Sequence, residues 1–187
     1  STEITAGSYR WGLHHGPQYN VFVGEGLYEF TGSESYPTSS RHLGATTDGC
    51  VDCHMTDAYG TQAGGHTFNM GYDYHGSTVF NFPSSCETAA CHGGKDLVDD
   101  LAEPKQVVIE ALLLSVGAEL ERLLVKEVGT GYLVHTSNPT VVAPQTHQML
   151  AAFTNWQALE EDRSKGLHNY PYAFAILTNT YELLAAM

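Results

Sequence analysis

The second half of the chain carries a regular spacing of apolar residues. Between Pro104 and Val128 they recur every three or four positions, at Val108, Leu112, Val116, Leu120, Leu123 and Leu124. This spacing is typical of one face of a helix, and Pro104 and Gly129 suit its start and its end. We therefore predict a helix over residues 104–128.

Two further helices are predicted towards the C-terminus. One runs from about Gln145 to Arg163 and stops near Gly166. The other starts after Asn169 and Pro171 and continues to the end of the chain. Two short extended runs, 132–135 and 140–142, precede them and predict a turn or a small hairpin.

The first half of the chain lacks this periodicity. Glycines and prolines interrupt residues 1–49, which favours loops and short turns of helix. Residues 50–96 contain all four cysteines and few aliphatic side chains, so this stretch cannot form a conventional apolar core alone. We expect a mainly α fold with extensive loops and little β structure. It forms one domain over 1–187, with a loop-rich half at 1–96 and a helical half at 97–187.

Composition narrows the class of protein. The 187 residues suit one domain, and 42% hydrophobic content argues for a folded chain. The formal charge is −13, from 21 acidic against 8 basic residues, which disfavours a nucleic-acid partner because phosphates are bound by Lys and Arg. No run approaches the roughly 18 apolar residues of a membrane span. We expect neither a nucleic-acid partner nor a transmembrane segment.

The sequence Cys50-Val-Asp-Cys53-His54 is a C-x-x-C-H motif, the attachment motif of c-type haem. Each cysteine sulfur adds to one vinyl group of the porphyrin. The histidine that follows the second cysteine is thereby placed under the iron as its proximal ligand.

A second motif, Cys86-Glu-Thr-Ala-Ala-Cys91-His92, has four residues between the cysteines in place of two. It uses the only other cysteines, and a histidine again follows directly. The motifs therefore predict two covalently attached haems, with sulfur attachment at Cys50, Cys53, Cys86 and Cys91 and proximal ligands His54 and His92.

Two alternatives account for the cysteines differently. Their spacing is compatible with a structural zinc site, and in an exported chain they are compatible with two disulfides. Neither alternative explains the two trailing histidines. Two porphyrin faces would also supply the apolar surface that residues 50–96 lack.

Several short motifs together resemble multihaem cytochromes related to ammonia-forming cytochrome c nitrite reductase. In chain order they are His15-Gly-Pro-Gln-Tyr, Ser40-Arg-His42-Leu-Gly, Cys50-Val-Asp-Cys-His-Met55, Gly65-His66-Thr-Phe-Asn and Ser164-Lys-Gly-Leu-His168-Asn. Both the residues of these motifs and their order along the chain resemble that family, and the resemblance covers most of the chain from Leu13 on. It implies a haem-organised multihaem cytochrome c fold.

The resemblance also implies the distal ligands. His168 would complete the haem on His54, and His42 would complete the haem on His92, so that both haems are bis-histidine and low-spin. His66 would ligate a haem that this chain does not have, which makes it the alternative distal ligand. His15 would correspond to the family's substrate-pocket histidine.

The chain departs from that family at the centre of its chemistry. The reductase carries its catalytic haem on a C-x-x-C-K motif, and this sequence has none. What is present resembles the electron-delivering part, so we expect an electron carrier and not an enzyme. The alternatives are a small-molecule reductase of nitrogen oxides or peroxide, or its electron-donor subunit, and a haem-based sensor or adhesive module.

Partners and location follow from this function. We expect redox proteins as partners, and the acidic surface would steer a basic one. We also expect self-association, with a filament that aligns haems from chain to chain as its extended form. The expected location is periplasmic or extracellular, after removal of a signal peptide.

Overall fold

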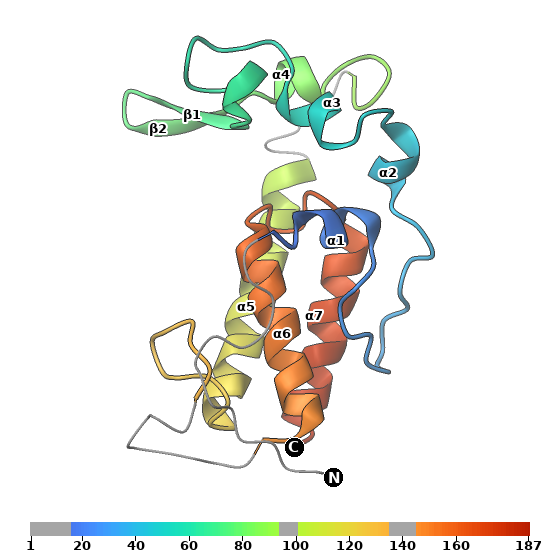
Figure 1. Cartoon of the computed structure of the whole chain (residues 1–187), viewed down its shortest axis with the longest axis vertical. Helices are drawn as coiled ribbons and strands as arrows, with labels where there is room; N and C mark the ends of the chain where they lie inside the picture. The colour runs from blue at the N-terminus through green and yellow to red at the C-terminus, as the bar shows by residue number, and fades with distance from the viewer. Residues whose placement is uncertain (1–15, 94–100, 135–144) are drawn as a thin grey trace. The chain divides into compact units, whose positions relative to one another are not determined.

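The computed structural model describes residues 16–93, 101–134 and 145–187. The described residues form two compact units, one of residues 16–40, 106–134 and 145–187 and the other of residues 41–93 and 101–105. Long helices dominate the first unit, and the described residues contain a single two-stranded sheet, which lies in the second unit (Figure 1). The prediction of a mainly α fold with little β structure is confirmed.

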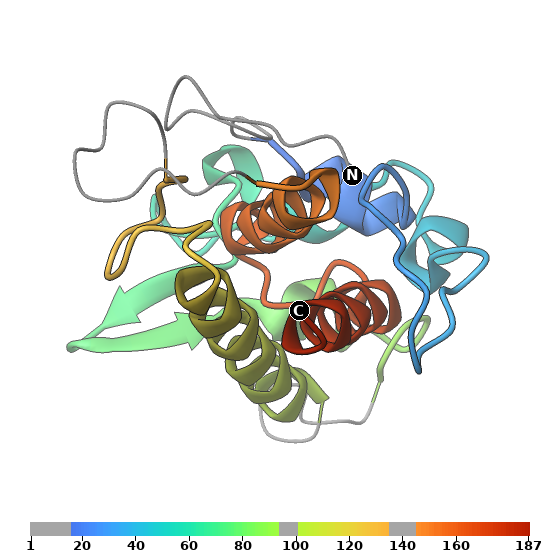
Figure 2. The same cartoon turned by 90° about the horizontal axis from the view of Figure 1, so that it is seen from below.

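The first unit is built on three long helices, α5 (Glu103–Arg122), α6 (His147–Asp162) and α7 (Tyr170–Ala185). They lie side by side when viewed from their lower ends (Figure 2). Their facing sides form one apolar core that includes Ile109, Phe153 and Ile176, each fully buried. Trp156 of α6 donates its indole N–H to the carbonyl of Leu113 at 3.1 Å, which ties α6 to α5.

The three predicted helices are therefore present, with one boundary shifted. α5 ends at Arg122, six residues before the predicted end at Val128. Leu124 takes a left-handed conformation, and the N–H groups of Leu124 and Val125 bond back to the carbonyls of Glu121 and Leu120. This pair of bonds is a Schellman cap, which ends the helix before Gly129 is reached.

An N-terminal segment belongs to the same unit. It contains the short helix α1 (Gln18–Val23) and an extended strap over residues 27–36. Buried Asn155 bonds both the N–H and the carbonyl of Tyr28, each at 2.8 Å. Buried Asn179 accepts from Glu34 N–H at 3.0 Å and donates to the carbonyls of Phe30 and Glu34. The side chains of Asn155 and Asn179 thus provide the hydrogen-bond partners that a neighbouring β-strand would otherwise provide for this backbone.

The second unit consists of short elements. In chain order they are α2 (Arg41–Ala45), α3 (Cys50–His54), the 3-10 turn η1 (Gly65–Thr67), β1 (Gly71–Tyr74), β2 (Ser77–Phe80) and α4 (Phe82–Ser85). The strands pair antiparallel, with Gly71 opposite Phe80 and Tyr74 opposite Ser77. His75 and Gly76 form the two-residue turn, and both have positive φ, as a tight hairpin requires.

The predicted extended runs and the predicted absence of a membrane span can be compared with the described residues only in part. The extended run at 140–142 and His135 at the end of the run 132–135 lie outside the described residues, although Leu133 forms a single bridge with Lys126. Within the described ranges, no helix combines the length and the apolar character that crossing a membrane requires.

Candidate functional site

Both cysteine motifs belong to the second unit, where α3 and α4 contact each other. The hydroxyl of Thr56, just after the first motif, lies 3.4 Å from that of Ser84, just before the second. Burial raises the pKa of the Cys53 thiol to about 11, and the nearby Cys86 adds to the shift. The two attachment sites are therefore close neighbours.

The first motif occupies the helix α3. Cys50 and Cys53 are three residues apart, so they share one helix face, and His54 follows directly. Asp52 accepts backbone hydrogen bonds from Thr47 at 2.7 Å and Asp48 at 2.9 Å. These bonds hold the loop before α3 in place, and they do not involve Cys50 or Cys53.

The second motif forms a closed loop. The N–H of His92 donates to the carbonyl of Cys86 at 3.0 Å, and that of Cys91 donates to Thr88 at 3.0 Å. A Cβ on Gly93 would lie 2.8 Å from the Cα of Ala89, so this position needs glycine. The four extra residues are taken up within the loop, and Cys91 and His92 follow one another as Cys53 and His54 do.

His54 is held by Phe68. Its Nδ1 lies 2.8 Å from the Phe68 carbonyl, and the two rings stack with centroids 4.8 Å apart and planes 7° apart. A carbonyl can only accept, so Nδ1 carries the proton and Nε2 keeps its lone pair for a metal. Phe68 has a φ of 61°, an unusual conformation for a side chain of this size, of the kind found at functional sites.

The structure brings His42 and His92 together within the second unit. Their ring centroids are 6.4 Å apart and their planes differ by 88°. Two metal–nitrogen bonds of about 2 Å, with about 1 Å from each nitrogen to its ring centre, separate two axial imidazoles by about 6 Å. The observed spacing fits one metal held between the two rings.

His168 belongs to the first unit, and its ring is held by Asp162. Nδ1 of His168 lies 2.6 Å from Oδ1 of Asp162, whose side chain is fully buried. Ser164 donates to the other oxygen of the same carboxylate and accepts from the backbone N–H of His168 at 3.2 Å. This arrangement leaves Nε2 as the ligating atom. His54 lies in the other unit, so its pairing with His168 stays a prediction.

The alternative ligand His66 is exposed in η1. The two glycines before it have a local structural explanation, because a Cβ on Gly64 would lie 2.5 Å from the carbonyl of Asp57. They are therefore not by themselves a sign of a nearby porphyrin. His15, the position matched to a substrate-pocket histidine, lies outside the described residues.

The second unit has almost no apolar core of its own. Among its described residues, 41–93 and 101–105, the buried apolar side chains are Ala63, Phe82 and Ala102. Large apolar side chains are instead exposed, among them Val51 beside the first motif and Phe68 beside His54. A folded unit of this size needs more buried apolar surface than these residues provide. Two porphyrins between the cysteine motifs would provide it, so the residues present fit haem.

The two alternative uses of the cysteines are absent from the described structure. All four cysteines are free thiols, so no disulfide links them. Within the described ranges, no group of three or more His, Cys, Asp or Glu side chains is arranged to hold a metal ion.

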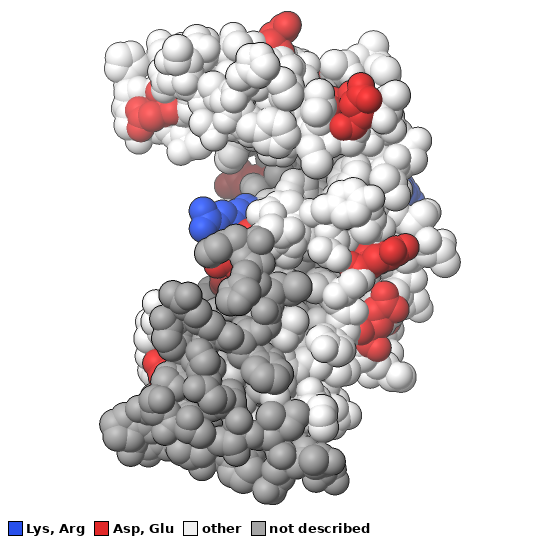
Figure 3. Space-filling model, in the orientation of Figure 1, with Lys and Arg blue, Asp and Glu red and all other residues white. Residues whose placement is uncertain are grey.

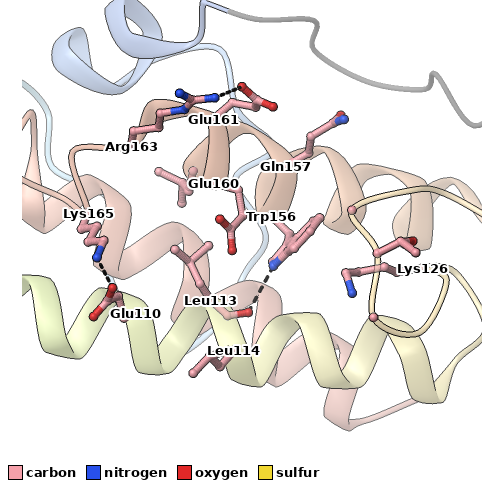
Figure 4. A pocket seen from close by; sticks show the side chains of 14 residues that line it. Glu110, Leu113, Leu114, Lys126, Trp156, Gln157, Glu160, Glu161, Arg163 and Lys165 are labelled. Atoms are coloured by element: carbon pink, nitrogen blue, oxygen red, sulfur yellow. Dashed lines mark hydrogen bonds and ion pairs between the residues drawn. The ribbon is translucent and has the colours of Figure 1, made fainter.

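A separate cavity of about 860 Å³ lies in the first unit between α5, α6 and residues 126–131 (Figure 4). None of the predicted site residues line it. Most of its charged side chains form ion pairs: Lys165 with Glu110, Arg163 with Glu161, and Lys126 with Glu121, a residue outside the lining, at 2.5 Å. The haem chemistry predicted from the sequence therefore belongs elsewhere.

Acidic side chains are spread over the face shown in Figure 3 and do not gather in one patch. This agrees with the formal charge of −13.

Two residues of the site were not expected from the sequence. Asp162 and Phe68 accept hydrogen bonds from the ligand candidates His168 and His54. Asp162 lies six residues before its histidine and Phe68 lies 14 residues after its own. Neither spacing is a known signature, so only the folded structure identifies them.

Comparison with family models, with curated proteins and with solved structures found no match to this chain. The resemblance to multihaem cytochromes therefore rests on the short motifs quoted above. The assignment of function rests on these motifs and on the geometry of the second unit.

Proposed function

We propose that this chain is a dihaem c-type cytochrome that carries electrons and is not itself an enzyme. The observation that supports it best is the second unit. The helix α3, which carries the first cysteine–histidine motif, contacts α4, which directly precedes the second, in a unit whose described residues bury only three apolar side chains. A covalently attached, flat apolar cofactor explains both features.

The residues that would hold the cofactors follow from the motifs. Cys50 and Cys53 attach one haem and Cys86 and Cys91 the other, with His54 and His92 as proximal ligands. His42 is the proposed distal ligand beside His92, and the 6.4 Å between their ring centres supports this. His168 is the proposed distal ligand of the first haem. His66 remains the alternative distal ligand.

When bound, the haems supply a one-electron redox couple. The chain contributes rigid ligands: His54 is fixed by a carbonyl and a stacked ring, and His168 by a buried carboxylate. Ligands held in this way change little in position between oxidation states, which suits repeated electron transfer. The dispersed acidic surface would attract a basic redox partner at low ionic strength.

The enzymatic alternative requires one axial position that a substrate can occupy. A nitrogen-oxide or peroxide reductase would leave one haem open or weakly ligated, whereas two strong imidazole ligands close it. Titration with cyanide and nitric oxide separates the two functions, because an electron carrier resists both. Turnover of nitrite to ammonia by the purified protein would favour the reductase.

Self-association is part of the proposal, and the outer face of α5 is its proposed contact. Val107, Ala111, Leu114 and Ala118 are exposed there at spacings of four, three and four residues, and Leu114 is 76% exposed. This is the spacing of a coiled-coil seam. The seam carries no charge although the chain has a charge of −13, so a second copy can dock on it without bringing acidic groups together.

The proposed location is periplasmic or extracellular, because c-type haem is attached there and not in the cytoplasm. Expression with a haem-attachment system in the periplasm is therefore the appropriate test. Electrospray mass spectrometry of the denatured protein should give the mass of the chain plus two haems. A chain without haem, or with zinc alone, would overturn the proposed function.

A further inference from the structure

The Nδ1 atoms of His54 and His168 face different kinds of hydrogen-bond acceptor. Nδ1 of His54 faces a neutral backbone carbonyl, that of Phe68, at 2.8 Å. Nδ1 of His168 faces the carboxylate of Asp162 at 2.6 Å. A charged acceptor forms the shorter and stronger hydrogen bond, and the distances follow that order.

Asp162 is placed for this contact by the end of α6. It is the last residue of the helix, and its side chain is fully buried. Both of its oxygens accept hydrogen bonds, one from His168 and one from Ser164. A buried carboxylate without hydrogen bonds would be strongly disfavoured, so these two bonds account for its presence in the interior.

The loop between the two residues is tightly shaped. Arg163, Lys165 and Gly166 have φ values of 58°, 51° and 88°. A Cβ on Gly166 would lie 2.8 Å from Cγ1 of Ile109, so the loop is pressed against α5. Left-handed conformations at two residues that are not glycine cost free energy. In this strained conformation the loop places His168 beside Asp162.

We propose that Asp162 is a positioning residue for His168: its carboxylate holds the Nδ1–H, presents Nε2 as the ligating atom and makes the imidazole a stronger electron donor. This rests on the proposed function, in which His168 is an axial haem ligand. A stronger donor stabilises the oxidised iron, so the carboxylate of Asp162 lowers the reduction potential of the haem bound by His168.

The experiment is spectroelectrochemical titration of the dihaem protein and its variants. Asp162→Asn keeps an acceptor oxygen and removes the charge, so the haems stay low-spin while one midpoint potential rises. At the wild-type midpoint the ratio of oxidised to reduced haem should fall about tenfold, which is a shift of about 59 mV for one electron. Asp162→Ala also removes the acceptor and should convert part of one haem to the high-spin form.

Glu161→Gln is the matched control. It removes the same charge from the adjacent position of α6, where Glu161 pairs with Arg163 at 3.9 Å. Its potentials should stay close to those of the wild type. If Asp162→Asn shifts the potential no more than Glu161→Gln does, the positioning role is wrong.

A second measurement does not depend on whether the variants fold. In the reduced, diamagnetic wild-type protein, proton NMR should show a slowly exchanging Nδ1–H of His168. A proton on Nε2 of His168 would overturn the proposal. A chain that carries no haem at all would instead refute the proposed function, so the two failures are distinguishable.

Discussion

The ring centroids of His42 and His92 lie 6.4 Å apart with their planes nearly perpendicular, although 50 positions separate the two residues in the sequence. His42 lies on α2 and His92 at the end of the loop that the second cysteine pair closes. The sequence assigned these two histidines to one haem through a family resemblance alone. The separation of the two rings in the second unit is compatible with two imidazoles on one metal, and their pairing stays a prediction.

His42→Ala should open the haem that is attached by Cys86 and Cys91. The removal of one axial imidazole leaves a vacant position on this haem. About half of the total haem in the protein should therefore become high-spin and bind carbon monoxide when reduced. Absorption and electron paramagnetic resonance spectra measure this. His75→Ala, in the hairpin turn, is the control and should leave both haems low-spin. If His66→Ala opens this haem and His42→Ala does not, the assignment of His42 is wrong.

His168→Ala should open the other haem in the same way. This prediction comes from the sequence, because His168 and His54 lie in different units. The double variant with His42→Ala should then have two high-spin haems, and carbon monoxide binding should double relative to either single variant. Equal binding in the single and double variants would mean that both histidines serve one haem.

Most of the helical framework could be predicted from the sequence. Pro104, Asn169 and Pro171 mark helix starts by local chemistry, and all three lie at or next to the start of a helix. The end of α5 could not be predicted in the same way. Its cap uses Leu124 in a left-handed conformation that usually belongs to glycine, so the residue type at this position gives no signal of a helix end.

The elements that position the site were harder to predict. The hairpin 71–80 contains aromatic residues in both strands and β-branched residues in the second, around His75-Gly76, a weak turn signal that is visible in retrospect. Buried Asn155 and Asn179 have no local signature at all, because a buried amide inside a helix depends on a distant backbone segment for its partners. The ligand candidates were found from the motifs, whereas their acceptors Asp162 and Phe68 required the fold.

Asn179→Ala should destabilise the first unit by about 3 kcal/mol. The substitution leaves the N–H of Glu34 and the carbonyls of Phe30 and Glu34 without their partner, and all three hydrogen bonds are part-buried. Urea denaturation followed by far-ultraviolet circular dichroism measures the change. Ser33→Ala is the control in the same strap: it loses an exposed bond to Glu182 and should cost less than about 1 kcal/mol. Equal losses would show that the buried amide has no special role.

Tyr172 should make stability depend on pH in the alkaline range. Burial raises the pKa of its hydroxyl to about 12 in the folded chain, above its ordinary value of 10.0. The unfolded chain therefore loses this proton first, so the contribution is complete below pH 10 and is lost as the pH rises towards 12. The free energy of unfolding should fall by about 1.4 kcal/mol per pH unit in that window.

Tyr172→Phe should lose this part of the slope. Denaturant titrations at several values between pH 9 and pH 11.5 give the difference between the variant and the wild type at each pH. Tyr19→Phe, at a position that is 63% exposed, is the control and should keep the wild-type slope. A Tyr172→Phe variant with the wild-type slope would show that another group titrates in this range.

The outer face of α5 should control assembly. Leu114 lies in the middle of the uncharged seam and is 76% exposed, so Leu114→Glu places a charge in the proposed contact without disturbing the core. Against a second copy the two introduced carboxylates would face each other across an apolar surface, which is strongly unfavourable. The variant should therefore remain monomeric at concentrations where the wild-type protein, measured by light scattering and electron microscopy, forms dimers or filaments.

Val128→Glu is the matched control, because Val128 is 77% exposed and lies beyond the end of α5, and it should assemble like the wild type. A wild-type protein that stays monodisperse and monomeric at high concentration, with both haems low-spin, would refute the contact.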